Sequence, residues 1–159
     1  MNALELKALT KTYPNFRLDS LDLVLPSGCI LGLIGENGAG KSTTIKLILG
    51  LIQRDGGNIR ILGQDQEQAL PLIKQDIGVV LDEVGIPGCF NTKQVGNVMR
   101  HTYSRWDDAL YSHYLKRLSL PSDKLFQEFS RGMKMKLGIA VALSHHPKLL
   151  ILDVNCRIA

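Results

Sequence analysis

The sequence has few cysteines and no long hydrophobic run, and both shortages limit what the protein can be. Its three cysteines, Cys29, Cys89 and Cys156, lie far apart and form no Cys-x-x-Cys pair. We therefore expect reduced thiols in a cytosolic protein rather than a metal or redox site. No apolar run reaches the roughly 18 residues that a membrane helix needs, and the stretch MNALELKALT is too charged for a signal peptide. Any membrane role is expected to come through a partner.

The excess of positive over negative side chains is also small, which limits the classes of partner that the protein can bind. Lys and Arg number 19 against 15 Asp and Glu, so the net charge is +4 and the isoelectric point is near 9.0. This mild excess permits an anionic ligand, but it is not the basic stripe of nucleic-acid binders, and we expect no nucleic-acid partner. With 45% hydrophobic and 21% charged residues, the 159-residue chain is long enough for one folded domain with a core.

Two segments near the N-terminus alternate apolar and polar residues, which is the pattern of half-buried strands. The first begins at Leu4, and the second runs from Phe16 to Pro26. The turn residues Pro14 and Asn15 lie between them, so the two segments are predicted to form an antiparallel pair.

Further along, apolar runs alternate with segments of helical spacing. The runs predicted as strands are 29–35, which is expected to be buried on both faces, 77–83 and 148–153. The segment 55–63 is predicted to be a turn followed by a short strand. Helices are predicted at 41–52 and at 68–76, the second with Pro71 near its start. Two helices are predicted within 92–118, separated near Ser104 to Asp108, with Asp107 as an N-cap. A last helix is predicted to begin at Ser130 and to end at Pro147. Strands that alternate with helices predict an α/β fold with a largely parallel sheet.

The segment GENGAGKS, Gly35 to Ser42, fits the phosphate-loop pattern G-x-x-x-x-G-K-[ST] in full. Gly35, Gly38 and Gly40 permit backbone angles that a side chain would forbid, so the loop can turn its N–H groups toward an anion. A helix that begins near Lys41 adds the positive end of its dipole. The Lys41 ammonium can reach the β- and γ-phosphates, and the Ser42 hydroxyl can ligate Mg²⁺. The motif therefore predicts phosphoryl chemistry on a nucleotide.

The stretch from Leu9 to Gly63 resembles the start of an ATP-binding-cassette (ABC) transporter ATPase, and the resemblance extends to Asp153. The segments IGVVLDE and SRGMKMKLGIAVAL are similar to a bacterial subgroup that powers small exporters of antibiotics or peptides. The resemblance implies an α/β P-loop NTPase core that is incomplete at its C-terminus. It implies one partial nucleotide-binding domain over 1–159, with an antiparallel β region at 1–30 and a helical insert at about 92–128.

The resemblance also assigns the contacts to ATP. Tyr13 stands where the family has an aromatic residue that stacks on adenine, and such stacking is worth about 1–3 kcal/mol per base. The alternative is a tyrosine that only packs at the strand edge. The implied nucleotide-binding residues are Tyr13, Gly35, Asn37, Gly38, Ala39, Gly40, Lys41, Ser42 and Thr43.

The implied ligands of Mg²⁺ are Ser42, Asp82 and Asp153. Asp82 stands where the family usually has a glutamine that contacts Mg²⁺ and the attacking water and links the site to the membrane partner. A carboxylate can also ligate Mg²⁺, but it adds negative charge near the γ-phosphate. Glu83 is an alternative ligand, and both residues can also be plain strand-end acids.

The segment FSRGM, Phe129 to Met133, stands where the family signature usually reads Leu-Ser-Gly-Gly-Gln. Ser130 and Gly132 match, whereas Phe129, Arg131 and Met133 depart. In the family this loop opens a helix and caps the γ-phosphate bound by the opposite subunit. Ser130 as an N-cap followed by free N–H groups suits an anion, and the alternative is an ordinary capped helix.

Asp153 matches the Mg²⁺-binding carboxylate of the Walker B strand, and the family usually continues with a glutamate that activates water. Here the next residue is Val154, which cannot accept a proton. The loop that crosses the dimer, a further strand and a γ-phosphate-sensing histidine are not present in the sequence either. We therefore expect slow hydrolysis or none. We also expect poor stability and aggregation, because buried strands would lack a neighbour.

The last residues, Asn-Cys-Arg-Ile-Ala, suggest a cause for this ending. Their codons can be AAC TGC CGG ATT GCN, which read one base later give Thr-Ala-Gly-Leu, a sequence of the type that follows the Walker B glutamate in the family. The hypothesis is a frameshift or degraded gene. The alternatives are a genuine short variant and an end introduced by cloning.

Several other residues are predicted to have structural roles. His145 and His146 resemble a metal pair, but adjacent residues point apart on a helix, so we expect a helix end where positive charge suits the dipole. Tyr103 and Trp106 are expected in the core of the helical insert or on its partner surface.

The function that the resemblance implies is an ATP-binding subunit that couples MgATP binding and hydrolysis to export, peripheral on the inner face of the membrane. Its implied partners are a membrane subunit and a second nucleotide-binding subunit, identical or different. One alternative is a catalytically silent ATP-binding partner. Another is a soluble cassette ATPase that acts on nucleic acid or the ribosome, which the absence of a basic stripe disfavours.

Overall fold

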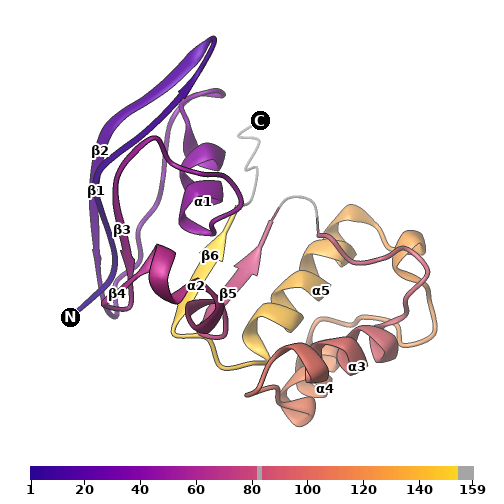
Figure 1. Cartoon of the computed structure of the whole chain (residues 1–159). Helices are drawn as coiled ribbons and strands as arrows, with labels where there is room; N and C mark the ends of the chain where they lie inside the picture. Colours follow the sequence, from indigo (N-terminus) through magenta and orange to yellow (C-terminus); the bar gives the residue numbers. More distant parts are fainter. Residues whose placement is uncertain (82–83, 154–159) are drawn as a thin grey trace. The chain divides into compact units, whose positions relative to one another are not determined.

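The computed structural model describes residues 1–81 and 84–153, and the chain divides into two compact units, Met1–Lys74 and Gln75–Ala159 (Figure 1). The first unit contains β1 (Asn2–Tyr13), β2 (Phe16–Pro26), α1 (Lys41–Ile48), β3 (Gly56–Ile61), β4 (Gln64–Asp65) and α2 (Gln66–Lys74). The second contains β5 (Ile77–Val80), α3 (Thr92–Thr102), α4 (Asp108–Arg117), the 3₁₀ turn η1 (Phe126–Glu128), α5 (Arg131–Leu143) and β6 (Leu149–Leu152).

The first unit is built on an antiparallel sheet with strand order β2-β1-β3-β4. Tyr13 pairs with Phe16 across the turn, which confirms the predicted hairpin. The predicted short strand after the turn at residues 55–57 is β3. Side chains of β1 and β3 that face the same side of the sheet form its core: Leu4, Leu6, Leu9, Ile59 and Ile61. Leu9 joins this face only because the register shifts between Leu6 and Leu9, where Ala8 has a φ of 49°. Strict alternation from Leu4 would have placed Ala8 on this face instead, but Ala8 is exposed.

The segment 29–34 contradicts its prediction as a strand buried on both faces. It forms no strand in the structure, and its apolar side chains are exposed, with Ile30 and Ile34 almost fully so. A strand buried on both faces needs a hydrogen-bonded neighbour on each edge and side chains over each face. Among the described residues no strand pairs with this segment, so its apolar composition alone does not make it a strand.

Helix α2 is present, but it begins at Gln66, two residues before the predicted start. Pro71 therefore lies inside the helix rather than near its beginning. The first residue of the helix is Gln66, whose buried side chain donates from Nε2 to the carbonyls of Leu47 (2.5 Å) and Ile48 (2.8 Å) at the end of α1. The start also has a local signal, because Oδ1 of Asp65 accepts from the N–H of Glu67 at 3.0 Å.

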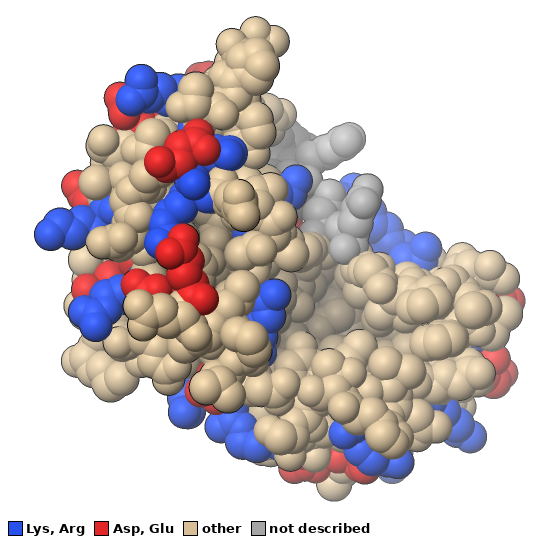
Figure 2. Space-filling view, viewed as in Figure 1, with Lys and Arg blue, Asp and Glu red and all other residues tan. Residues whose placement is uncertain are grey.

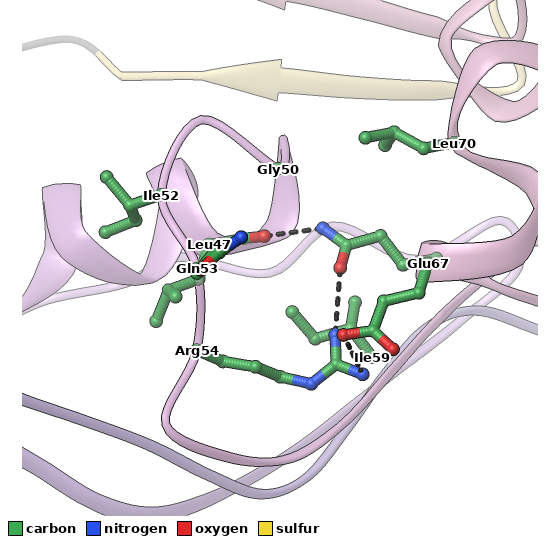
Figure 3. Close-up of a pocket in the computed structure, with 9 residues that line it drawn as sticks. Leu47, Gly50, Ile52, Gln53, Arg54, Ile59, Glu67 and Leu70 are labelled. Carbon is green, nitrogen blue, oxygen red and sulfur yellow. Dashed lines mark hydrogen bonds and ion pairs between the residues drawn. The ribbon is translucent and has the colours of Figure 1, made fainter.

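Beside this contact lies a pocket of about 450 Å³ within the first unit (Figure 3). The Arg54 guanidinium donates to Oε1 of Gln66 (3.2 Å) and pairs with Glu67 (3.0 Å). Apolar side chains, among them Leu47, Ile59 and Leu70, line the rest of the pocket. The polar groups of Gln66 thus all have partners, which is what burial of an amide requires.

In the second unit, β5 and β6 pair in parallel, with Ile77 opposite Leu149 and Val80 opposite Leu152. Helix α5 packs closely on this pair, because Gly78 has no side chain. A β-carbon there would lie 2.7 Å from the carbonyl oxygen of Ala142. The predicted strands at 77–83 and 148–153 are therefore confirmed over 77–80 and 149–152, and residues 82–83 lie outside the described part.

The helical part of the second unit follows the predicted order: two helices, α3 and α4, separated near Ser104 to Asp108, and then a third helix, α5. Asp107 caps α4, accepting from the N–H of Leu110 at 2.8 Å, as predicted. Trp106 packs against the core of these helices, with its ring centroid 5.0 Å from that of Tyr111. The buried members of this core are Val95, Tyr111, Phe126, Phe129, Leu137 and Ala140.

His145 and His146 follow the end of α5, as predicted. The imidazole of His145 is fully buried, stacks on Tyr103 with centroids 3.9 Å apart, and contacts the carbonyl of Ile77 through Nε2 at 3.0 Å. Burial lowers the pKa of His145, and Arg105 and His146 add to this effect, whereas the hydrogen bonds to the carbonyls of Ile77 and Val141 act against it. The lowered pKa disfavours the cation that was expected at the helix end.

No helix among the described residues is both long and apolar enough to cross a bilayer. On the face that Figure 2 draws, Lys and Arg side chains lie among Asp and Glu side chains, separated by wide uncharged areas. Cys29 and Cys89 are exposed free thiols, and Cys156 lies outside the described residues.

Candidate functional site

The candidate site begins with the glycine-rich loop before α1. Gly38 and Gly40 have φ of 88° and 92°, in the left-handed region that a side chain disfavours, as the motif predicted. Gly35 does not share this conformation. A β-carbon on Gly35 would instead lie 3.1 Å from the side chain of Ala39, so close approach is what favours glycine there. Two of the three glycines, Gly38 and Gly40, therefore have the backbone conformation that the motif predicted.

Lys41 is the first residue of α1, and its ammonium lies over the loop. Nζ donates to the carbonyls of Gly35 (2.6 Å) and Glu36 (2.7 Å). The side chain is a point charge on a flexible four-carbon stem, so the ammonium can turn from these carbonyls to a phosphate oxygen. The loop thus holds a cation beside the N-terminus of a helix, where an anion is favoured.

The residues that follow Lys41 divide between solvent and core. Ser42 is exposed and Thr43 half-buried in the first turn of α1, so both hydroxyls are near the loop. Thr44 is buried, and its Oγ1 donates a hydrogen bond to the carbonyl of Gly40 at 2.9 Å. Asn37 and Ala39 lie in the exposed part of the loop. An exposed hydroxyl and free N–H groups at a helix start are suitable for phosphate and for a hard cation.

Tyr13 lies at the end of β1 with 40% of its surface exposed. Its ring is 6.5 Å from that of Phe16 and tilted by 33°, and the ammonium of Lys11 is 5.6 Å from its centroid. Both the tyrosine and the loop belong to the first unit. An exposed aromatic face is the feature that base stacking requires.

The signature segment lies in the second unit. Ser130 is the N-cap of α5, and its Oγ accepts from the N–H of Met133 at 3.2 Å, which confirms the predicted cap. Arg131 and Gly132 are exposed at the start of the helix. Phe129, which departs from the usual signature, is buried in the helical core. This departure therefore has a packing role.

Asp153 directly follows β6, and its N–H donates to the carbonyl of Val80 at 2.8 Å. The carboxylate thus comes at the end of a short parallel strand, as the Walker B pattern predicted. Among the described residues no group of three or more His, Cys, Asp or Glu side chains could hold a metal. Asp82 and Glu83 lie outside the described residues, and so does Val154. The phosphate loop and Asp153 belong to different units, each described by itself.

Comparison with known families decides the identity. A family profile described as "ABC transporter" matches residues 18–155 of the chain. The chain belongs to the ABC transporter family. This assignment agrees with the family resemblance noted from the sequence.

Curated relatives of this ABC protein include antibiotic transport proteins. It is 33% identical to the daunorubicin/doxorubicin resistance ATP-binding protein DrrA of Streptomyces peucetius, over 95% of the chain and 48% of DrrA. It is 37% identical to the bacitracin transport ATP-binding protein BcrA of Bacillus licheniformis, over 91% of the chain and 48% of BcrA. The chain therefore spans about half the length of these relatives.

Solved structures place the fold in the same family. A structure described as the ATP-binding subunit of an ABC transporter superposes with a TM-score of 0.83 at 29% identity, over 95% of this chain and 65% of that one. A dimeric ATP-binding cassette bound to ADP and Pi superposes with a TM-score of 0.80 at 19% identity, over 96% of this chain and 88% of that one. The second likeness shows the shared P-loop NTPase fold alone.

Two features of this ABC chain were not found from the sequence. The ring of Phe16 lies against Gly40 of the phosphate loop, and Gln66 holds the far end of α1. The sequence offers only weak signals for either: an aromatic residue close after Tyr13, and a polar residue at a position that proves to be buried. Both contacts join residues far apart in the chain, so local patterns do not reveal them.

Proposed function

We propose that this chain is the ATP-binding part of an ABC exporter and that it binds MgATP through its phosphate loop. The observation that carries the proposal is the loop itself: Gly38 and Gly40 in left-handed conformations, followed at once by Lys41 at the start of α1. The likeness to antibiotic transport proteins supports the exporter class. In the proposed complex, Tyr13 stacks on the base, and the loop N–H groups with Lys41 hold the β- and γ-phosphates.

Mg²⁺ is proposed to bind to the oxygen ligands that the chain provides, the Ser42 hydroxyl and the Asp153 carboxylate. Both are ligand types that Mg²⁺ prefers, usually with phosphate oxygens and waters. Bound Mg²⁺ would offset the negative charge of the phosphates. Asp82 is the third proposed ligand.

Hydrolysis by this chain is proposed to be slow or absent. The residue after Asp153 is Val154, whose side chain has no atom that can accept a proton or orient water. A positioned general base contributes typically about 10²–10⁴-fold in rate. Nucleotide binding without rapid turnover is therefore the expected behaviour.

The proposed partners are a membrane subunit and a second nucleotide-binding subunit, with the chain peripheral on the inner face of the membrane. One neighbour is described as part of the ABC transporter complex cbiONQ, and another as a dimeric cassette. Ser130 at the N-terminus of α5 is proposed to cap the γ-phosphate bound by the second subunit. Binding and release of ATP would then shift the dimer between closed and open populations.

A second candidate function is a catalytically silent partner that holds ATP in one half of an asymmetric pair. Val154 in place of glutamate favours this candidate, because it removes the base but leaves the phosphate loop unchanged. Both functions predict ATP binding, and they differ in the turnover expected from the assembled transporter.

Calorimetric titration with MgATP, paired with a phosphate-release assay, tests the proposal. We expect saturable binding that Lys41→Ala abolishes, and little phosphate release. Failure of the unchanged chain to bind MgATP would contradict the proposed function. Turnover that Lys41→Ala abolishes would contradict the role given to Val154. Co-purification with a membrane protein supports the transporter role, whereas co-purification with RNA instead would contradict it.

A further inference from the structure

We propose that Phe16 is a positioning residue for the phosphate loop, which it holds through Gly40. The proposal rests on the proposed ATP-binding function and adds a residue to that site. Phe16 is the first residue of β2 and is half-buried, whereas its cross-strand neighbour Tyr13 is exposed. The two aromatic side chains at this end of the hairpin therefore face different surroundings.

The contact with Gly40 is close. A β-carbon on Gly40 would lie 2.7 Å from Cζ of Phe16 and 3.5 Å from Cδ1 of Leu18. Phe16 and Leu18 are two apart in the strand, so they share one face of β2. This face lies directly against the backbone of the residue that caps α1, and no side chain separates them.

Gly38 provides an internal comparison within the same loop. It has nearly the same left-handed conformation, with φ of 88° against 92°, but a β-carbon there would have no neighbour within 4 Å. The conformation alone therefore does not explain the position of Gly40. Gly40 is also tied from its other side, because the N–H (2.8 Å) and Oγ1 (2.9 Å) of Thr44 both donate to its carbonyl.

The result is a division of roles between the two aromatic residues. Gly40 is held between the face of β2 and the first turn of α1, so the ring of Phe16 restricts where the loop backbone can move. Restriction of this kind favours binding, because a preorganised loop has less freedom to lose when it holds the phosphates. Tyr13 is available to the base, while Phe16 acts on the phosphates through the loop.

Tripolyphosphate separates these roles, because it offers the phosphate chain without a base. We would titrate the whole chain and its variants with Mg²⁺–tripolyphosphate and with MgATP by calorimetry, after circular dichroism has shown that each variant is folded. Phe16→Ala is expected to weaken the affinity for both ligands by a similar factor, about three- to tenfold. Tyr13→Ala is expected to weaken the affinity for ATP and leave that for tripolyphosphate unchanged.

Two further variants keep the test decisive. Phe16→Leu retains an apolar strand residue but lacks the Cζ atom nearest Gly40, so it should show the same paired loss if Phe16→Ala does not fold. Leu23→Ala removes an apolar side chain elsewhere on β2, and it should leave both affinities unchanged. A merely structural role for Phe16 would lower stability in the same way as Leu23→Ala without a loss of tripolyphosphate affinity.

The proposal is overturned if Phe16→Ala and Phe16→Leu weaken ATP alone, since that marks a base contact, or if they change neither affinity. Failure of the unchanged chain to bind either ligand would instead contradict the proposed function itself. If the unchanged chain binds both ligands and the Phe16 variants keep full tripolyphosphate affinity, the proposed function stands and the role of Phe16 does not.

Discussion

Replacement of Gln66 by methionine is predicted to destabilise the first unit, because its amide links three partners. Nε2 donates to the carbonyl of Leu47, and Oε1 accepts from Arg54 (Figure 3). Nε2 also donates to the carbonyl of Ile48. Methionine has a similar volume but makes none of these hydrogen bonds. The Leu47 carbonyl still accepts a hydrogen bond from the N–H of Gly50 at 3.1 Å, and Arg54 still forms its ion pair with Glu67. The Ile48 carbonyl has no other donor among the described residues.

The expected loss of stability follows from the partners that remain: the Leu47 carbonyl and Arg54 keep another partner after the substitution, whereas the Ile48 carbonyl does not. A buried carbonyl left without a donor costs about 1–3 kcal/mol, and the two remaining bonds contribute about 0.5–1.5 kcal/mol each when lost. Because Leu47 and Arg54 retain other partners, we expect Gln66→Met to lower the free energy of unfolding by about 2–4 kcal/mol in total. The end of α1, and with it the helix that carries the phosphate loop, should open more readily.

Hydrogen exchange of the amides in α1 and β3 measures this effect, because the only tryptophan, Trp106, belongs to the second unit. Glu67→Gln is the matched control. It removes the ion pair with Arg54, but the Glu67 side chain is 68% exposed, so the expected cost is about 0–1 kcal/mol. A loss of protection in Gln66→Met no larger than in Glu67→Gln would refute the reasoning.

Three further predictions concern other parts of the chain. The second unit should lose stability as the pH falls below 6.5, the ordinary pKa of histidine, because burial lowers the pKa of His145 and the unfolded state then binds the proton more readily. In thermal unfolding across this pH range, the melting temperature should depend less steeply on pH in His145→Gln than in the unchanged chain. Thr92→Val should leave stability unchanged or raise it by up to about 1 kcal/mol in urea unfolding, since the buried Thr92 hydroxyl has no described partner; a clear loss would point to a missed partner. Gly57→Ala should cost at least about 2 kcal/mol, because φ is 84° and a β-carbon would overlap the Ala8 carbonyl. Gly56→Ala, with more space and no positive φ, is its control, and an equal loss in both would contradict the prediction.

Local signals in the sequence predicted the parts of the site that depend on neighbouring residues. The phosphate loop needs glycine in a left-handed conformation before a helix, and GENGAGKS provides this at Gly38 and Gly40. Asp107 and Ser130 cap their helices as predicted, since a capping side chain bonds to a backbone group only three residues away. Both partners of such an interaction lie within a few residues of each other, so the local sequence is enough to predict it.

Contacts between distant segments were decided only by the tertiary structure. The apolar segment 29–34 has a strand-like sequence, but a strand needs partners that its own residues cannot supply. Packing removes His145 from water and so lowers its pKa, although its place at a helix end would favour a cation. The sequence by itself determined the phosphate loop and its helix. Tertiary packing decided what holds them, Phe16 at Gly40 and Gln66 at the far end of α1, because both contacts depend on burial between residues at least 18 apart in the chain.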